Sequence, residues 1–109
     1  MFEQAVWMEY KSRGHELFWF KAEGECDFLI FDSGKMTTCI QACTELTMEN
    51  QEREISGLLE AMKETQCNDG VILTLRHYQD MVIEGIPIKI RPFWNVILAD
   101  SPLIQKLKW

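Results

Sequence analysis

The run VILTL, at residues 71–75, is continuously apolar and follows directly on an amphipathic helix pattern. Such a run is typical of a central strand that is covered on both faces. The helix pattern begins at Thr47, the expected N-cap, and places one apolar stripe at Ile55, Leu58, Leu59 and Met62. A strand pattern at 36–43 precedes this helix. A strand, a helix and a second strand in this order predict parallel neighbours joined by a right-handed crossover.

The remaining patterns predict a mixed α/β domain. A helix is expected at 2–13, and strands joined by tight turns are expected at 16–20, 26–31 and 36–43, so these three pair antiparallel. Glu84-Gly85 predicts a hairpin between strands at 81–83 and 86–90, after which Pro92 breaks the strand and a short helix spans 93–98. The expected fold is therefore a mixed β-sheet flanked by helices, with the element order α-β-β-β-α-β and a C-terminal hairpin.

Composition limits the partners and the location that this chain can have. The 109 residues suffice for one domain with its own core, and the formal net charge is −6. A negative chain is poorly suited to nonspecific nucleic-acid binding, which depends on neutralising phosphates. The apolar runs are too short to span a membrane, and the N-terminus lacks the basic lead of a signal peptide. We therefore expect a cytoplasmic protein with no membrane contact.

The cysteines and histidines do not form a metal-binding motif in the sequence. No two of the four cysteines, Cys26, Cys39, Cys43 and Cys67, have CxxC spacing, so we expect reduced and mostly buried thiols. The two histidines, His15 and His77, have no ligand partner at close spacing. The sequence therefore predicts no zinc site.

Acidic and amide residues interrupt the expected helix and strands at three places. Glu3 lies on the first helix, Asp27 on the second strand, and Gln41-Ala42-Cys43 on the third. In element order and in these positions, the chain resembles the PD-(D/E)XK nuclease superfamily. There, an acid on the first helix, an Asp on the second strand and an E-x-K on the third converge at one sheet edge. The carboxylates hold Mg²⁺, and the Lys, two residues from the Glu and on the same strand face, helps to activate water.

The chain departs from that pattern at two of its positions. Gln41 stands where the superfamily has Glu, and Cys43 stands where it has Lys. Losing one charged ligand and the cation together weakens both metal binding and phosphoryl transfer. The site Glu3, Asp27, Gln41 and Cys43 is therefore interpreted as vestigial, without a cofactor. In the alternative interpretation, Glu3 and Asp27 bind Mg²⁺ and Gln41 assists.

Simpler structural explanations of these residues remain open. Asp27 and Gln41 can be polar groups at strand ends, hydrogen-bonded within the fold, and direct pairing between them depends on a strand register that sequence does not fix. Glu3 is more often a solvated or capping acid. Arg53 and Glu54 are expected to be charges on a helix surface, with the alternative that Glu54 approaches the sheet edge that carries Asp27. Cys43 has no visible base that would make it a nucleophile.

An ordered set of longer segments resembles the C-terminal domain of uncharacterised bacterial and archaeal AAA-type ATPases. The segments are ECDF at 25–28, IQAC at 40–43, the helix from Arg53-Glu54 to Leu58, GVILTL at 70–75 and IEGIPIKIRPFWNVIL at 83–98. The resemblance covers about residues 2–98 and implies a nuclease-like fold with a degraded catalytic centre. In that family an ATPase domain precedes this one, but the chain has no G-x-x-x-x-G-K-[ST] loop. Residues 1–109 are thus expected to be a single nuclease-like domain without its ATPase domain: a detached domain, a truncated gene product or an excised domain.

Two functional hypotheses follow from the sequence. The first is a non-catalytic, nuclease-like domain that acts as an interaction or regulatory module, with a protein partner or a second copy of itself. Trp109, after Leu107, is the tryptophan most expected to contact a partner. The second is a weak, metal-dependent DNA or RNA nuclease.

Overall fold

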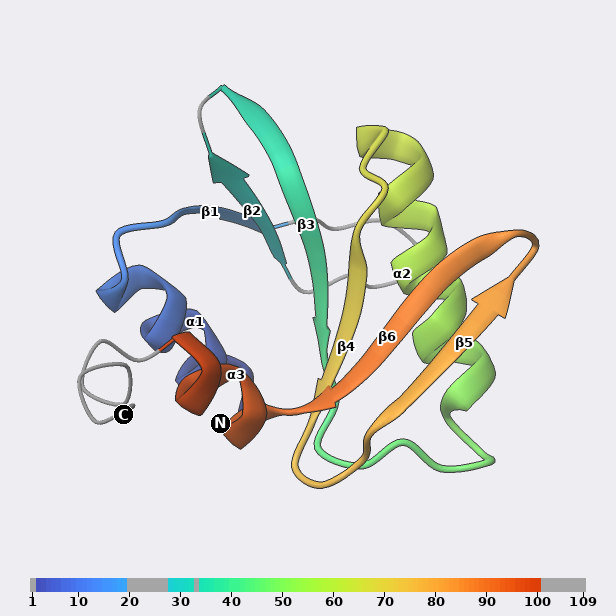
Figure 1. Cartoon of the computed structure of the whole chain (residues 1–109). Coiled ribbons are helices and arrows are strands. Elements are labelled where there is room, and N and C mark those ends of the chain that lie inside the picture. The colour runs from blue at the N-terminus through green and yellow to red at the C-terminus, as the bar shows by residue number, and fades with distance from the viewer. Residues whose placement is uncertain (1, 20–27, 33, 101–109) are drawn as a thin grey trace.

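The fold is a mixed six-stranded sheet with helices on both faces (Figure 1). The computed structural model describes residues 2–19, 28–32 and 34–100, with the backbone alone at 96 and 98–100. In chain order the elements are α1 (Phe2–Ser12), β1 (Glu16–Trp19), β2 (Phe28–Asp32), β3 (Lys35–Ala42), α2 (Gln51–Thr65), β4 (Gly70–Thr74), β5 (Gln79–Ile83), β6 (Ile86–Pro92) and α3 (Phe93–Asp100). The predicted mixed α/β class and the predicted element types are confirmed in the described parts of the chain.

The strands lie in the order β1-β2-β3-β4-β6-β5. β1, β2 and β3 pair antiparallel, as their tight turns predicted, and β3 pairs parallel with β4 through the α2 crossover. β6 lies parallel to β4 and antiparallel to β5, which leaves β5 at an edge of the sheet. The carboxyl ends of β3, β4 and β6 therefore meet at one end of the molecule.

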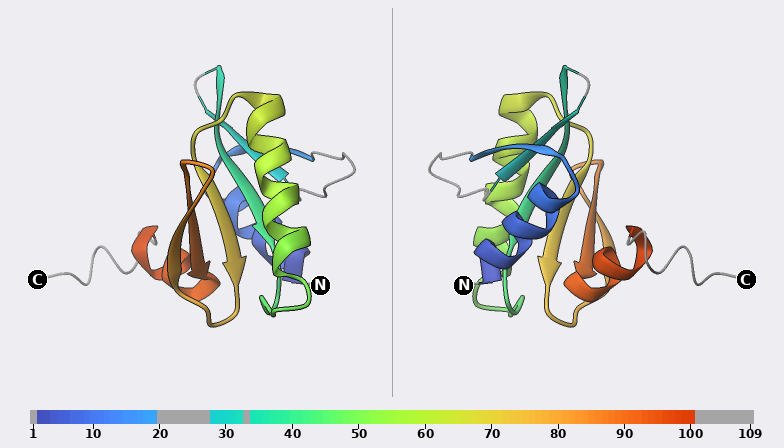
Figure 2. Two further views of the ribbon diagram at one scale, coloured as in Figure 1. Left: turned by 90° about the vertical axis from the view of Figure 1, so that its right-hand side faces the viewer. Right: turned by 90° about the vertical axis from the view of Figure 1, so that its left-hand side faces the viewer.

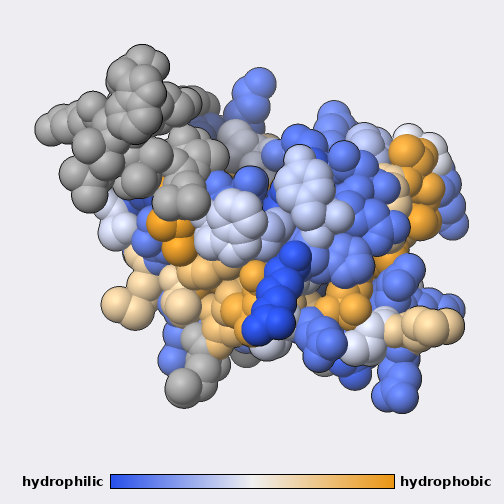
Figure 3. Space-filling model, turned by 60° about the horizontal axis from the view of Figure 1, so that its bottom comes forward, coloured by the Kyte–Doolittle hydropathy of each residue, from blue (hydrophilic) through white to orange (hydrophobic). Residues whose placement is uncertain are grey.

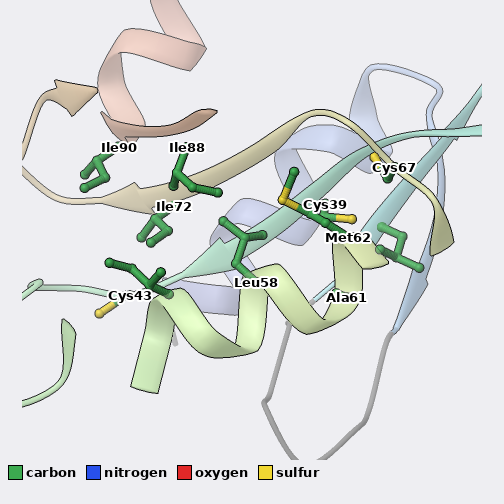
Figure 4. Packing of buried hydrophobic residues seen from close by; sticks show 11 residues of the cluster. Cys39, Cys43, Leu58, Ala61, Met62, Cys67, Ile72, Ile88 and Ile90 are labelled. Atoms are coloured by element: carbon green, nitrogen blue, oxygen red, sulfur yellow. The ribbon is translucent and has the colours of Figure 1, made fainter. Parts of the chain in front are cut away.

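Two apolar clusters hold the helices against opposite faces of the sheet. Alternation along β3 points Cys39 and Cys43 toward α2, while Ile40 and Ala42 point toward α1. On the α2 side, Leu58 and Met62 reach from the helix toward the sheet (Figure 4). On the other face, Phe2 and Val6 of α1 pack in the second cluster together with Phe93, the first residue of α3. Figure 2 shows α2 and α3 on opposite sides of the sheet.

The start of α2 differs from the prediction. Regular helix begins at Gln51, four residues after Thr47. Thr47 and Asn50 nevertheless form the reciprocal bonds of a capping box around the preceding turn. The Thr47 N–H donates to Asn50 Oδ1 (2.7 Å), and the Asn50 N–H donates to Thr47 Oγ1 (3.2 Å). Thr47 therefore caps the turn at 47–50, and the regular helix begins only after that turn.

Pro92 ends the strand as predicted, although it belongs to the strand, which was expected to end at Ile90. It is the last residue of β6 and pairs with Thr74 of parallel β4. On its other edge, β6 pairs with β5 only up to Ile90. Pro92 therefore has no β5 residue opposite it. A proline is tolerated there because no ladder hydrogen bond is lost.

The predicted hairpin turn is present between β5 and β6. Glu84 and Gly85 both have positive φ, at 52° and 80°. This is the backbone of a type I′ turn, whose twist matches that of paired strands. Of the described helices, none has the length and apolar character needed to cross a membrane.

Candidate functional site

A shallow hollow lies at the carboxyl end of β3, where the amino ends of α1 and α2 also meet. Its walls come from Phe2 and Glu3 of α1, from the segment 42–45 that ends β3 and follows it, and from the turn and first residues of α2. A second hollow, lined by Arg76 and His77 among others, adjoins it after β4 and shares residues 44 and 45. Figure 3 looks onto this end of the molecule, where hydrophobic surface is bordered by hydrophilic side chains. Carboxyl ends of parallel strands are a common place for binding sites.

A buried polar pair joins β3 to α2 next to this hollow. The Gln41 amide Nε2 donates to Glu54 Oε2, with Gln41 2% and Glu54 8% exposed. Gln41 Oε1 is buried and has no hydrogen-bond partner among the described residues. The prediction that Glu54 is a surface charge was wrong, whereas Arg53 beside it is exposed and approaches it only to 3.8 Å. Glu54 also lines the hollow, so one carboxylate contacts both the core and the candidate site.

Cys43 occupies the position where the nuclease pattern has Lys. Its Sγ donates to the Glu45 backbone oxygen (3.2 Å) and lies 3.6 Å from Asn50 Nδ2. Burial, together with the nearby Glu54 carboxylate, raises the pKa of the Cys43 thiol to about 11. At neutral pH, Cys43 is therefore a protonated thiol. It supplies neither the positive charge of a lysine nor a reactive thiolate.

The structure brings part of the predicted site together. Glu3 is exposed on α1 and lines the same hollow as Cys43 and Glu54, while Gln41 lies behind Glu54. Asp27 lies outside the described residues. The last described pair between β2 and β3 is Phe28 with Ile40, so the predicted Asp27–Gln41 pairing is one residue beyond the described register.

The described residues contain only part of the nuclease pattern, because Asp27 lies outside them. Among them, no group of three His, Cys, Asp or Glu side chains is placed to share an ion. His15 Nδ1 lies 3.2 Å from Asp32 Oδ1, and His77 Nε2 lies 2.7 Å from Gln79 Oε1, each away from the Gln41–Glu54 pair. The carboxylate nearest to Gln41 is already engaged by the amide of that residue.

Glu54 was expected as a helix charge able to approach the Asp27 edge, but its burial and its pairing with Gln41 were not predicted, although the sequence contained a signal for them. It lies four residues before Leu58 and seven before Ala61, both fully buried, so it falls on the buried stripe of α2. An acid on such a stripe requires a buried partner. Gln41, the polar residue inside a strand that α2 covers, is that partner.

Comparison with known proteins finds similarity to an uncharacterised archaeal protein. No protein-family model matches the chain. An uncharacterised protein of the archaeon Methanocaldococcus jannaschii is 37% identical over 105 residues. The match covers 85% of this chain and 23% of the relative, so the chain spans about a quarter of that protein's length.

Proposed function

We propose that this chain is a non-catalytic, nuclease-like domain that acts as an interaction or regulatory module, related to the C-terminal domain of AAA-type ATPases. One observation carries the proposal: Gln41 is tied to Glu54 in the core, and Cys43 beside it is a neutral thiol. A metal-dependent nuclease needs a free carboxylate and a cation at these two positions.

The chemistry explains why the two substitutions matter together. Mg²⁺ takes oxygen ligands and loses its waters reluctantly, so carboxylates with negative charge are needed to hold it. At Gln41 the ligand is neutral, and the Glu54 carboxylate accepts its amide hydrogen. Phosphoryl transfer also needs positive charge near the phosphate, which a protonated Cys43 does not provide. Metal binding and charge stabilisation are both weakened.

The size of the relative supports a modular role. In the Methanocaldococcus jannaschii protein, the matching region is 23% of the length, so there it is one part of a larger chain. A domain that has lost its chemistry but keeps a complete α/β core suits a role in protein contact within such an assembly. The link to an ATPase domain rests on the sequence resemblance.

A weak metal-dependent nuclease is the second candidate, and one observation favours it. Three acids, Glu3, Glu45 and Glu54, line the same hollow, although they are not close enough together to share one ion. Such a concentration of carboxylates attracts divalent cations in general. Under this alternative Glu3 and Asp27 would hold Mg²⁺ with the assistance of Gln41, and the bound ion would supply a Lewis acid.

A cleavage assay distinguishes the two candidates. The full chain is incubated with supercoiled plasmid and with single-stranded DNA or RNA in Mg²⁺ or Mn²⁺, and its thermal stability is followed with and without each ion. We expect no cleavage and no rise in melting temperature. Metal-dependent cleavage that Asp27→Ala abolishes, and that a matched change of the exposed helix acid Glu64→Gln leaves intact, overturns the proposal.

A further inference from the structure

A groove lies on the side of α2 that faces the β5–β6 hairpin, away from the candidate site. Its floor is apolar, and its rim carries two acids and an exposed methionine. We call this surface the α2–β5 groove and define it by its floor, Ile55, Leu59 and Ile83, and its rim, Met48, Glu52 and Glu84. In the left view of Figure 2, α2 and the β5–β6 hairpin lie to the two sides of β4.

The topology leaves this groove open in the described structure. α2 packs over β3 and β4, the strands that it connects, and β5 lies beyond β6 at the edge of the sheet. Consequently Ile83 and Leu59 are only partly buried against the core, and Met48 is 97% exposed. Half-covered apolar side chains beside a free strand edge are typical of a surface that binds another segment.

Charge identifies the kind of segment that the groove fits. Glu52 and Glu84 stand on the rim, and the ion pair between Lys63 Nζ and Glu84 Oε2 is long (3.7 Å) and exposed. Exposed pairs of this kind contribute little and exchange readily. An apolar floor between acids is complementary to a segment that carries apolar residues and lysines.

The C-terminal stretch of this chain has that composition. Residues 101–109, SPLIQKLKW, contain two lysines, Lys106 and Lys108, and no acid, although the whole chain has 17 acids and 11 basic residues. Three aliphatic residues, Leu103, Ile104 and Leu107, accompany the lysines. We propose that the α2–β5 groove binds residues 101–109 of a second copy of the chain.

The position of the α3 end favours a segment from a second copy, rather than from the same molecule, as the occupant of the groove. α3 ends at Asp100, on the opposite side of the sheet from α2 (Figure 2). A segment continuing from that point starts away from its own groove, whereas a neighbouring molecule presents its groove freely. Reciprocal exchange between two copies closes a dimer, because each copy offers one segment and one groove. This inference names a partner for the interaction module proposed above and in that sense rests on it.

Charge reversal tests the proposal directly. Self-association of the full chain is measured by sedimentation equilibrium over a wide concentration range. We expect reversible dimers in the wild type. Glu52→Lys with Glu84→Lys, and separately Lys106→Glu with Lys108→Glu, should each raise the dissociation constant by about tenfold or more. The four changes combined should restore association, and Glu64→Lys, an exposed acid of α2 outside the groove, should have no effect.

The other outcomes overturn the proposal. A monomer at all concentrations excludes the second copy, including the case in which the segment folds back on its own molecule. Dimers that neither reversal weakens use another surface, and dimers weakened only by the groove reversal bind a different segment. None of these results bears on catalysis. The non-catalytic assignment is overturned only by metal-dependent cleavage in the assay described above.

Discussion

Gln41 and Glu54 are a buried pair whose members depend on each other. A carboxylate that is 8% exposed loses most of its hydration, and the Gln41 amide replaces part of it. Removing one member leaves the other buried without a hydrogen-bond partner. Replacing both by apolar residues leaves no buried polar group that needs a partner. The pair should therefore show strong coupling rather than independent contributions.

We predict that Gln41→Leu lowers the free energy of unfolding by about 2–3 kcal/mol, because it leaves Glu54 unpaired. Glu54→Gln should cost less than about 1 kcal/mol, since the new amide oxygen still accepts from Gln41. The double change Gln41→Leu with Glu54→Leu should be less destabilising than Gln41→Leu alone. Urea denaturation of the wild type, Gln41→Leu, Glu54→Leu and the double variant measures the coupling, with Glu54→Gln as the conservative control. Additive changes would show that the hollow already hydrates Glu54.

The buried cysteines give the fold a dependence on alkaline pH. Burial, the largest cause, raises the pKa of Cys39 to about 12 from the ordinary 9.0, and the neighbouring Cys67 adds to the shift. Cys43 is raised to about 11. An unfolded chain releases these protons from about pH 9, while the folded chain keeps them.

The contribution of the protonated thiols to the free energy of unfolding should therefore be fully present below about pH 9. It should be lost as the pH rises toward the folded-state pKa values of about 11 and 12. The urea midpoint should fall across this range, and less steeply in Cys39→Ala with Cys43→Ser. At pH 8 iodoacetamide should label Cys39 and Cys43 slowly in the native protein and rapidly in urea, as followed by peptide mass spectrometry. Fast native labelling of Cys43 would contradict a protonated thiol.

At the scale of elements, local patterns predicted the parts of the fold that local physics decides. The stripe of α2 and the run VILTL gave a helix and a covered parallel strand, and Glu84-Gly85 gave the hairpin turn. The position of β6 beside β4 was not predictable, because a hairpin pattern fixes its own pairing and not which strand it joins. The Gln41–Glu54 contact likewise depends on how far α2 is rotated over β3, which is a tertiary property.

The β5–β6 turn is the clearest test at this scale. Gly85 has φ of 80°, where a Cβ is unfavourable although nothing lies within 4 Å of it. Gly85→Ala should lower the free energy of unfolding by about 1–2 kcal/mol through the backbone alone. Glu84→Asn, at φ of 52°, should raise it by a few tenths of a kcal/mol, since Asn tolerates this region. Thermal denaturation measures both, and equal effects of the two changes would rule out a type I′ turn.

At the scale of the whole molecule, charge sets the candidate site apart from a nuclease surface. The formal net charge is −6, and the hollow at the end of β3 is lined by Glu3, Glu45 and Glu54. Arg76 and His77 lie only around the adjoining hollow. A nucleic-acid backbone brought to this edge meets acids first, which opposes the approach that a nuclease requires.

We therefore predict no saturable binding of labelled DNA or RNA at physiological salt, measured by fluorescence anisotropy. Without phosphate neutralisation, any association at low salt should disappear as salt is added. Glu3→Lys with Glu45→Lys changes two acids to two bases and moves the formal net charge from −6 to −2. This variant should gain weak, salt-sensitive binding, whereas Glu60→Lys with Glu64→Lys, the same charge change away from the hollow, should gain less. Tight binding by the wild type that persists in salt would instead favour the nuclease alternative, because it would require contacts that charge does not supply.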